Sequence, residues 1–141
     1  MTIKSDQIDF GHWESDIICE DNILPFGFIY KITNLQSGKK YIGKKQCITT
    51  LKRPPLKGKK NKRHTIKETD WREYTSSSNK LNIDIVELGK QNFKFEIIKF
   101  CDSKWQLSYE EAKIQFAEEV LLKEEYYNGI INCRIGKGKS I

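Results

Sequence analysis

The side chains best placed for chemistry in this sequence are two tyrosines in a strongly basic part of the chain. Tyr30 and Tyr41 stand eleven residues apart, and between Asp21 and Glu68 there are thirteen Lys and Arg residues and no acidic residue. A tyrosine hydroxyl has an ordinary pKa near 10, so it needs cationic surroundings to act as a base, and we expect the nearby lysines to lower the pKa of Tyr30 in this way. A basic stretch of this kind is either a solvated loop or the contact surface for a polyanion, and its position beside the tyrosines favours phosphate contact.

The tyrosines must be positioned by a local fold, and the sequence around them predicts a β-hairpin. Within residues 26–46, FGFIYKITNLQSGKKYIGKKQ, two β-type runs flank the turn-rich segment NLQSG. Apolar and polar residues alternate around Phe28, Tyr30 and Ile32, as a half-buried strand requires. Turn residues between the runs predict a loop of about five residues. The hairpin would bring Tyr30 and Tyr41 near each other.

The rest of the chain predicts an α+β fold. Residues 1–25 form an acidic extension, with six Asp and Glu against one Lys, which we expect to pack through Phe10, Trp13, Ile17 and Ile18. Residues 47–70 read as a flexible Pro/Gly/Lys loop. The segment from Trp71 onward looks well ordered, and one domain would span residues 26–141.

Two helices and a strand are predicted after the basic loop. Ser77 or Ser78 would cap the first helix and Gly89 would end it. Residues 93–100, FKFEIIKF, read as a strand. Residues 108–127 predict a long helix, and the segment after it a turn and a last strand. We expect the apolar face of the long helix to carry Tyr109, Ala112, Phe116 and Val120.

Composition excludes several classes of protein. A chain of 141 residues, with 38% hydrophobic and 31% charged residues, fits one globular domain. No apolar run approaches the roughly 20 residues of a membrane span, and the N-terminus lacks the pattern of a signal peptide, so we expect a cytoplasmic protein without membrane contact. The four cysteines are widely spaced, which favours reduced thiols over a zinc site.

The tyrosine hairpin resembles the signature of the GIY-YIG nuclease family. Gly27-Phe28-Ile29-Tyr30 stands for the first half, with Phe28 inserted, and Tyr41-Ile42-Gly43 for the second. The block LNIDIVELGKQNFKFEII further on also resembles the family, and the likeness covers most of residues 27–132. It implies a small three-stranded antiparallel sheet flanked by helices. The chain resembles stand-alone enzymes of the homing or phage-encoded type, which implies the host cytoplasm if the protein is phage-encoded.

The resemblance also implies a site that hydrolyses DNA phosphodiester bonds with one divalent ion, Mg²⁺ or Mn²⁺. Tyr30 would activate or position the attacking water, and Tyr41 would hydrogen-bond the phosphate or the nucleophile. Glu111 would bind the metal; alternatively it completes an N-terminal capping box with Ser108. Asn128 would brace the site, or it is only a turn residue that ends the helix.

The cationic catalyst is less clearly marked. The family places an arginine about ten residues after the second tyrosine, where this chain has Leu51. Arg63 is the favoured replacement, because an arginine can give a phosphate two hydrogen bonds. Arg53, Arg72 and Lys45 are the alternatives, and the family's accompanying His or Tyr would be His64 or Tyr74.

The expected partner is double-stranded DNA, and each engagement would cut one strand, so a double-strand break would need a homodimer or two successive nicks. With no appended DNA-binding module in the sequence, the basic loop or a partner would have to recognise the site. Alternative hypotheses are an inactive nucleic-acid-binding module and an interaction module that recruits a basic protein through the acidic extension. That extension could instead lie over the basic stretch and restrain DNA binding. The residues expected to contact the nucleic acid are Lys44, Lys45, Arg53, Lys57, Lys59, Lys60 and Arg72.

Overall fold

The fold is centred on a three-stranded antiparallel sheet, as the sequence predicted. In the computed structural model, which describes residues 8–16, 23–61, 63–132 and 134–137, the strand order is β2-β1-β5. The strands are β1 (Gly27–Asn34), β2 (Lys40–Gln46) and β5 (Phe93–Cys101). β1 and β2 form the expected tyrosine hairpin, and the α+β class is confirmed.

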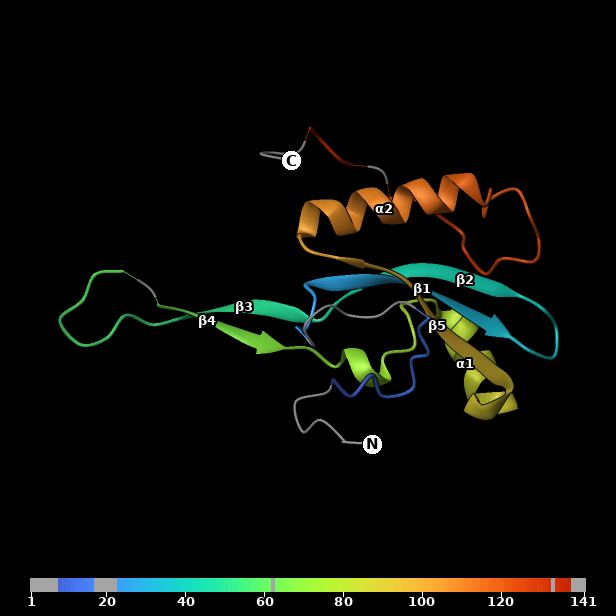
Figure 1. The fold of residues 1–141 in the computed structure, drawn as a ribbon, viewed down its shortest axis with the longest axis horizontal. Coiled ribbons are helices and arrows are strands. Elements are labelled where there is room, and N and C mark those ends of the chain that lie inside the picture. Colours follow the sequence, from blue (N-terminus) through green and yellow to red (C-terminus); the bar gives the residue numbers. More distant parts are fainter. Residues whose placement is uncertain (1–7, 17–22, 62, 133, 138–141) are drawn as a thin grey trace.

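One helix covers each face of the sheet (Figure 1). Helix α1 (Asn79–Leu88) packs Leu81 and Ile85 on the face that carries Phe28 and Tyr30. Helix α2 (Lys104–Ala117) packs Leu107 on the opposite face, which carries Ile29 and Ile42. The alternation of β1 therefore divides its side chains between two apolar clusters.

The first helix begins and ends where its capping residues predicted. The Ser78 side chain accepts a hydrogen bond from the Leu81 N–H at 3.3 Å, and Gly89, with φ +91°, ends α1. Short 3₁₀ helices precede and follow it, η2 (Trp71–Glu73) and η3 (Lys90–Asn92).

The second helix differs from the prediction. It begins at Lys104, capped by Ser103, and ends at Ala117. Ser108 therefore lies inside the helix, and the capping-box interpretation of Glu111 is wrong. The predicted apolar face is correct for Ala112 and Val120, which are buried, and wrong for Tyr109 and Phe116, which are exposed.

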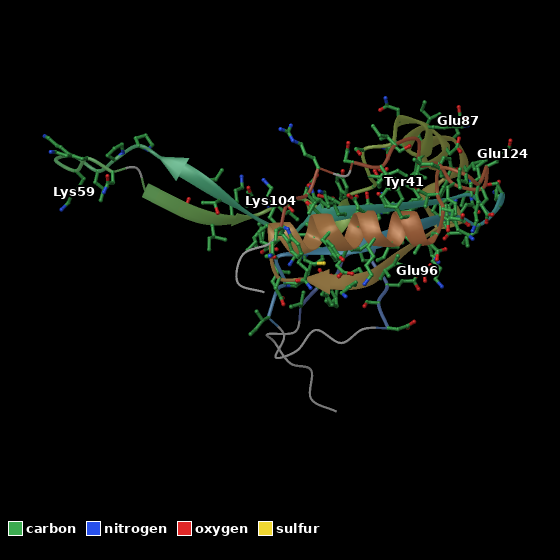
Figure 2. The ribbon with its side chains drawn as sticks, turned by 90° about the horizontal axis from the view of Figure 1, so that it is seen from above. Tyr41, Lys59, Glu87, Glu96, Lys104 and Glu124 are labelled. Carbon is green, nitrogen blue, oxygen red and sulfur yellow. The ribbon has the colours of Figure 1, made fainter. Side chains whose placement is uncertain are left out.

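The basic segment 47–70 is not one loop. It contains strands β3 (Ile48–Arg53) and β4 (Arg63–Glu68), which pair with each other in a separate two-stranded sheet. This hairpin projects past the body of the protein in two perpendicular views, with Lys59 near its far end (Figures 1 and 2). Thr and Ile supply the β-forming residues of these strands, a signal that the Pro/Gly/Lys composition of the tip obscured.

The two edges of the main sheet are covered by other segments. Glu14 forms a bridge beside β5, where its N–H donates to Phe95 and its carbonyl accepts from Ile97. At the other edge Lys40 of β2 bridges to Tyr126. The strand expected after α2 is absent from residues 127–132 and 134–137, and this single bridge takes its place.

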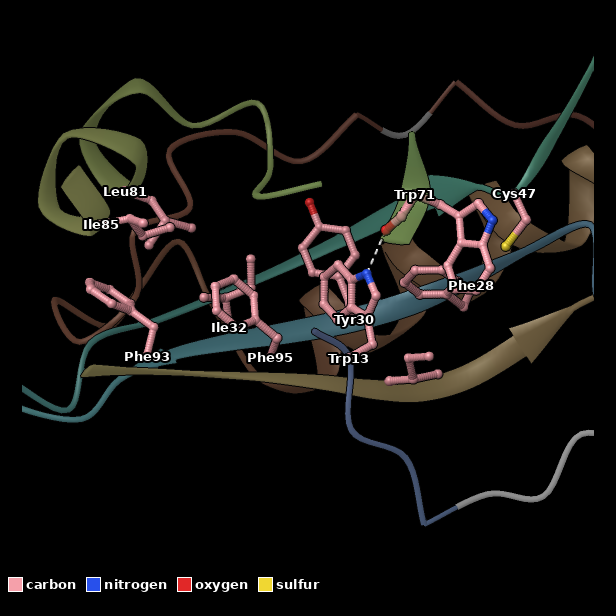
Figure 3. Packing of buried hydrophobic residues seen from close by; sticks show 11 residues of the cluster. Trp13, Phe28, Tyr30, Ile32, Cys47, Trp71, Leu81, Ile85, Phe93 and Phe95 are labelled. Atoms are coloured by element: carbon pink, nitrogen blue, oxygen red, sulfur yellow. Dashed lines mark hydrogen bonds between the residues drawn. The ribbon is translucent and has the colours of Figure 1, made fainter. Parts of the chain in front are cut away.

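The described part of the acidic extension belongs to the core. Trp13 is 5% exposed and packs beside Tyr30 and Phe28, and its Nε1 donates to the Trp71 carbonyl at 2.6 Å (Figure 3). Phe10 packs against the same cluster, while Ile17 and Ile18 lie outside the described residues. Within the described chain, none of the helices has the length and apolar character of a membrane span.

Candidate active site

Several of the residues singled out in the sequence meet at one pocket beside the edge strand β2. The pocket has a volume of about 270 Å³, which exceeds several times the roughly 30 Å³ of one water. It has more polar than apolar surface. Its lining residues come from β1, β2, the segment between η2 and α1, α2 and the C-terminal segment: Tyr30, Tyr41, Lys44, Tyr74, Ser77, Glu111, Gln115, Ile130 and Asn132.

Gly43 explains how a buried tyrosine reaches this pocket. Tyr30 pairs with Gly43 across the β1–β2 ladder, so the two residues face the same side of the sheet. A Cβ at Gly43 would lie 2.6 Å from the Tyr30 Oη and 2.7 Å from its Cζ. The ring of Tyr30 therefore lies over the place where a side chain of β2 would stand, and its hydroxyl extends to the edge of the sheet.

Gly27, in the first half of the signature, also permits a close approach. A Cβ there would lie 2.6 Å from the Lys45 carbonyl oxygen and 2.9 Å from a methyl carbon of Leu107. The glycine thus lets α2 approach the sheet, and the inserted Phe28 is fully buried on the opposite face.

Three tyrosine rings and one serine form the side of the pocket next to α1. The ring centroids of Tyr41 and Tyr74 each lie 6.2 Å from that of Tyr30. Ser77, just before the cap of α1, hydrogen-bonds to both Tyr41 and Tyr74. Ser77 therefore connects the hydroxyl groups of Tyr41 and Tyr74 on this side of the pocket.

Glu111 and Lys44 form the opposite side. The Glu111 side chain is 13% exposed, and its Oε1 lies 3.9 Å from the Lys44 Nζ, which also donates to the Ser108 hydroxyl at 3.0 Å. Burial raises the pKa of the Glu111 carboxyl, and the Lys44 charge opposes that rise only in part. Among the described residues, no three His, Cys, Asp or Glu side chains gather as a metal-binding group.

The expectation that nearby lysines lower the pKa of Tyr30 is wrong. Burial raises the pKa of Tyr30 well above its ordinary value, and Tyr41, Tyr74 and Glu111 add to the rise. Burial also raises the pKa values of Tyr41 and Tyr74. All three hydroxyls are consequently protonated at neutral pH and act as hydrogen-bonding groups.

Of the candidate arginines, Arg72 has a described side chain, and it does not line the pocket. Arg72 donates to Glu68 at 2.7 Å and to the Asp9 carbonyl at 2.7 Å, and it lies over the Trp71 ring. Arg63, Arg53 and His64 have their backbones in the β3–β4 hairpin, and their side chains lie outside the described part of the structure.

The cations closest to the tyrosines come from β2 instead. Lys45 lies 4.1 Å above the Tyr74 ring and 2.8 Å from the Asp70 carboxylate, so its charge is already paired. Lys44 is the one cation that lines the pocket among the described residues. The strand alternation indicates its direction, because Lys44 follows Gly43 and must point to the α2 face. Only the position of α2 shows that it lies beside Glu111.

Asn128 braces the edge of the sheet beside the pocket. Its side-chain amide donates to the Ile42 carbonyl at 2.8 Å and accepts from the Ile42 N–H at 3.0 Å. Because β2 is an edge strand, these backbone groups have no strand partner, and the amide satisfies both. Gln115, which the sequence analysis missed, donates to the same carbonyl at 2.8 Å. Its spacing of four residues from Glu111 was the available signal.

Comparison with protein families gives one match over most of the chain. The model described as "Putative endonuclease segE, GIY-YIG domain" matches residues 12–131. Neither the curated proteins nor the solved structures gave a match. The matched region begins just before Trp13 and contains every lining residue of the pocket except Asn132.

Proposed function

Since this chain belongs to the GIY-YIG endonuclease family, we propose that it hydrolyses phosphodiester bonds of double-stranded DNA, one strand per engagement, with Mg²⁺ or Mn²⁺. The observation that carries the proposal is the convergence of Tyr30, Tyr41, Lys44 and Glu111 on one polar pocket. A polar pocket with hydroxyls, one carboxylate and one ammonium group can hold a phosphate group and a water together.

The residues of the pocket fit a divalent ion. Glu111 is a largely buried carboxylate whose charge Lys44, at 3.9 Å, compensates only in part. One carboxylate that leaves the other positions to waters and a phosphate oxygen suits Mg²⁺. Glu111 would hold the ion, which supplies positive charge next to the phosphate when bound.

The protein's own side chains then position the reactants. The protonated Tyr30 hydroxyl donates a hydrogen bond at the edge of β2, where it holds either the attacking water or a phosphate oxygen. Tyr41, fixed by Ser77, orients the other side of the phosphate. Such fixed donors stabilise the charge that develops in the transition state without reorganisation.

Lys44 takes the part that the family gives to an arginine. Its side chain lines the pocket and is 39% exposed, so its ammonium group can reach a phosphate oxygen as well as Glu111. A lysine provides a point charge without the two-pronged geometry of an arginine. We therefore expect Lys44→Arg to retain cleavage and Lys44→Ala to lose it, with the fold unchanged.

The test is cleavage of supercoiled plasmid by wild type and Glu111→Ala, each with Mg²⁺ or EDTA. Metal-dependent nicking that the substitution abolishes supports the proposal. Glu110→Ala is the matched control, because Glu110 lies one residue away on α2 and pairs with Lys99 outside the pocket. Equal loss in both variants would assign the effect to the helix and not to the ligand.

A second candidate function is an inactive nucleic-acid-binding module. The observation that favours it is the lack of an arginine among the described pocket residues. It predicts that wild type and Glu111→Ala shift the plasmid equally and that neither nicks it with any divalent ion.

A further inference from the structure

The β3–β4 hairpin is a basic ribbon that the pocket does not explain. Residues 48–67 contain eight Lys and Arg and no acidic residue. Lys57, Lys59 and Lys60 at its tip are exposed and form no ion pair with any residue in the described ranges. Like charges gathered in this way repel one another, and a bound polyanion would offset the repulsion.

The ribbon has a defined shape. Six residue pairs join the strands, from Ile48 opposite Glu68 to Arg53 opposite Arg63. At the tip the Lys59 N–H donates to the Leu56 carbonyl at 2.8 Å, and Gly58 has φ +86°. These are the features of a type II turn, which places Lys57 and Lys59 on its two sides.

One cross-strand pair of the ribbon, between Ile48–Glu68 and Lys52–His64 on the same face, presents uncharged side chains to solvent. Thr50 and Ile66 are a directly opposed pair, both are exposed, and Ile66 is 73% exposed. An apolar residue this exposed in a strand has no role in the core. A threonine and an aliphatic side chain are suited to the methyl group and the base edges in a DNA groove.

We propose that the β3–β4 ribbon enters the major groove of duplex DNA, with Thr50 and Ile66 at base edges and the tip lysines on phosphates. This inference rests on the proposed nuclease function of the pocket. Two strands about 4.8 Å apart fit a B-DNA major groove about 12 Å wide. The deep, narrow major groove of duplex RNA does not admit them. The ribbon therefore selects DNA over RNA.

The geometry also sets the distance between recognition and cleavage. Thr50 follows Lys44 of the pocket by six residues, and an extended chain spans about 3.3 Å per residue. The base-reading face thus lies at most about 20 Å from the pocket, or about six base pairs at about 3.4 Å each. Since the ribbon leaves the body in one direction, the contacted bases lie to one side of the cut.

Binding is measured by fluorescence anisotropy with a 30-bp DNA duplex and the RNA duplex of the same sequence, between 50 and 200 mM KCl in EDTA. The triple variant Lys57→Ala/Lys59→Ala/Lys60→Ala should reduce the slope of log affinity against log salt by about 2.7, at about 0.9 per phosphate contact. The matched triple Lys80→Ala/Lys113→Ala/Lys123→Ala removes three exposed lysines elsewhere and should leave the slope unchanged. Circular dichroism checks that both variants fold.

Base reading is tested separately, by selection of bound sequences from a randomised duplex. Thr50→Ala/Ile66→Ala should lose the preference at positions within about six base pairs of the cut on one side, with affinity for random DNA kept. An unchanged preference, equal salt slopes in the two lysine triples, or equal binding of the DNA and RNA duplexes would each overturn the ribbon proposal. Plasmid nicking by wild type is scored independently, so failure of the ribbon and failure of the nuclease remain distinguishable.

Discussion

The substitution Gly43→Ala tests the central feature of the pocket, the passage of Tyr30 over β2. The added Cβ would stand 2.6 Å from the Tyr30 Oη, 2.7 Å from its Cζ and 2.9 Å from Tyr41 Cε2, whereas ordinary contact begins at 3.4 Å. One of the groups must move by about 0.8 Å, the shortfall of the closest contact from that limit. Tyr30 is 1% exposed, and the Trp13 ring lies 5.0 Å from it, so the ring has little room to retreat.

Overpacking of this kind costs about 1–3 kcal/mol of folding stability. For a chain of this size that corresponds to a fall in melting temperature of roughly 2–12 °C. The effect on cleavage should be larger, because a misplacement near 1 Å at a reacting group can cost about 100-fold in rate. Gly43→Ala should therefore fold, melt somewhat earlier and lose most of its plasmid nicking.

The matched control is Gly129→Ala, since a Cβ at Gly129 meets nothing within 4 Å and the residue has no positive φ. It should retain both stability and activity. Thermal melts by circular dichroism and nicking rates under identical Mg²⁺ provide the two readouts. Wild-type stability and rate in Gly43→Ala would refute the reasoning, because the Tyr30 hydroxyl would then not need the space above Gly43.

Three further predictions concern stability. Asn128→Ala should cost about 2–3 kcal/mol in a denaturant melt, because it leaves a buried backbone N–H without a partner; the exposed Asn132→Ala should cost almost nothing. Burial lowers the pKa of His12 to about 4 from 6.5, so the unfolded chain takes up the proton first. Stability should fall as the pH drops from about 6.5 towards 4, by about 1–2 kcal/mol when discounted for a partly solvated ring, and His12→Gln should flatten this dependence. Ser103→Ala should cost about 1 kcal/mol through loss of the helix cap, whereas Ser108→Ala should not, and the reverse order would contradict the observed start of α2.

Elements with a strong local signal were predictable from the sequence. The tyrosine hairpin combined strand alternation with turn residues, and α1 had a serine at one end and a glycine at the other. The start of the second helix was predicted wrongly because Ser103 and Ser108 both suit an N-cap, and only packing against the sheet decides between them. Strands β3 and β4 were not predicted, because the charged tip of the hairpin dominates the composition of residues 47–70.

The pocket was predictable only where a family motif named the residue. Tyr30, Tyr41 and Glu111 meet there, whereas Lys44 and Gln115 enter it through the position of α2 against β2, which no local pattern encodes. The expectation that lysines lower the pKa of Tyr30 was wrong for a related reason. The sequence shows many lysines nearby, but burial of the ring outweighs charges whose side chains point elsewhere.

The described part of the acidic extension completes the core behind the site. Trp13 packs against Tyr30, and its Nε1 bonds to the Trp71 carbonyl at 2.6 Å. Deleting residues 1–24 to look for a restraint on DNA binding would therefore remove a buried tryptophan, at a cost of about 3–5 kcal/mol. We expect Trp13→Ala in the full chain to lose stability and nicking together, while Trp105→Ala, stacked on the exposed Tyr109, loses much less of either. If Trp13→Ala melts and cuts like wild type, the extension is dispensable to the site, and its acidic residues can be tested by simple deletion.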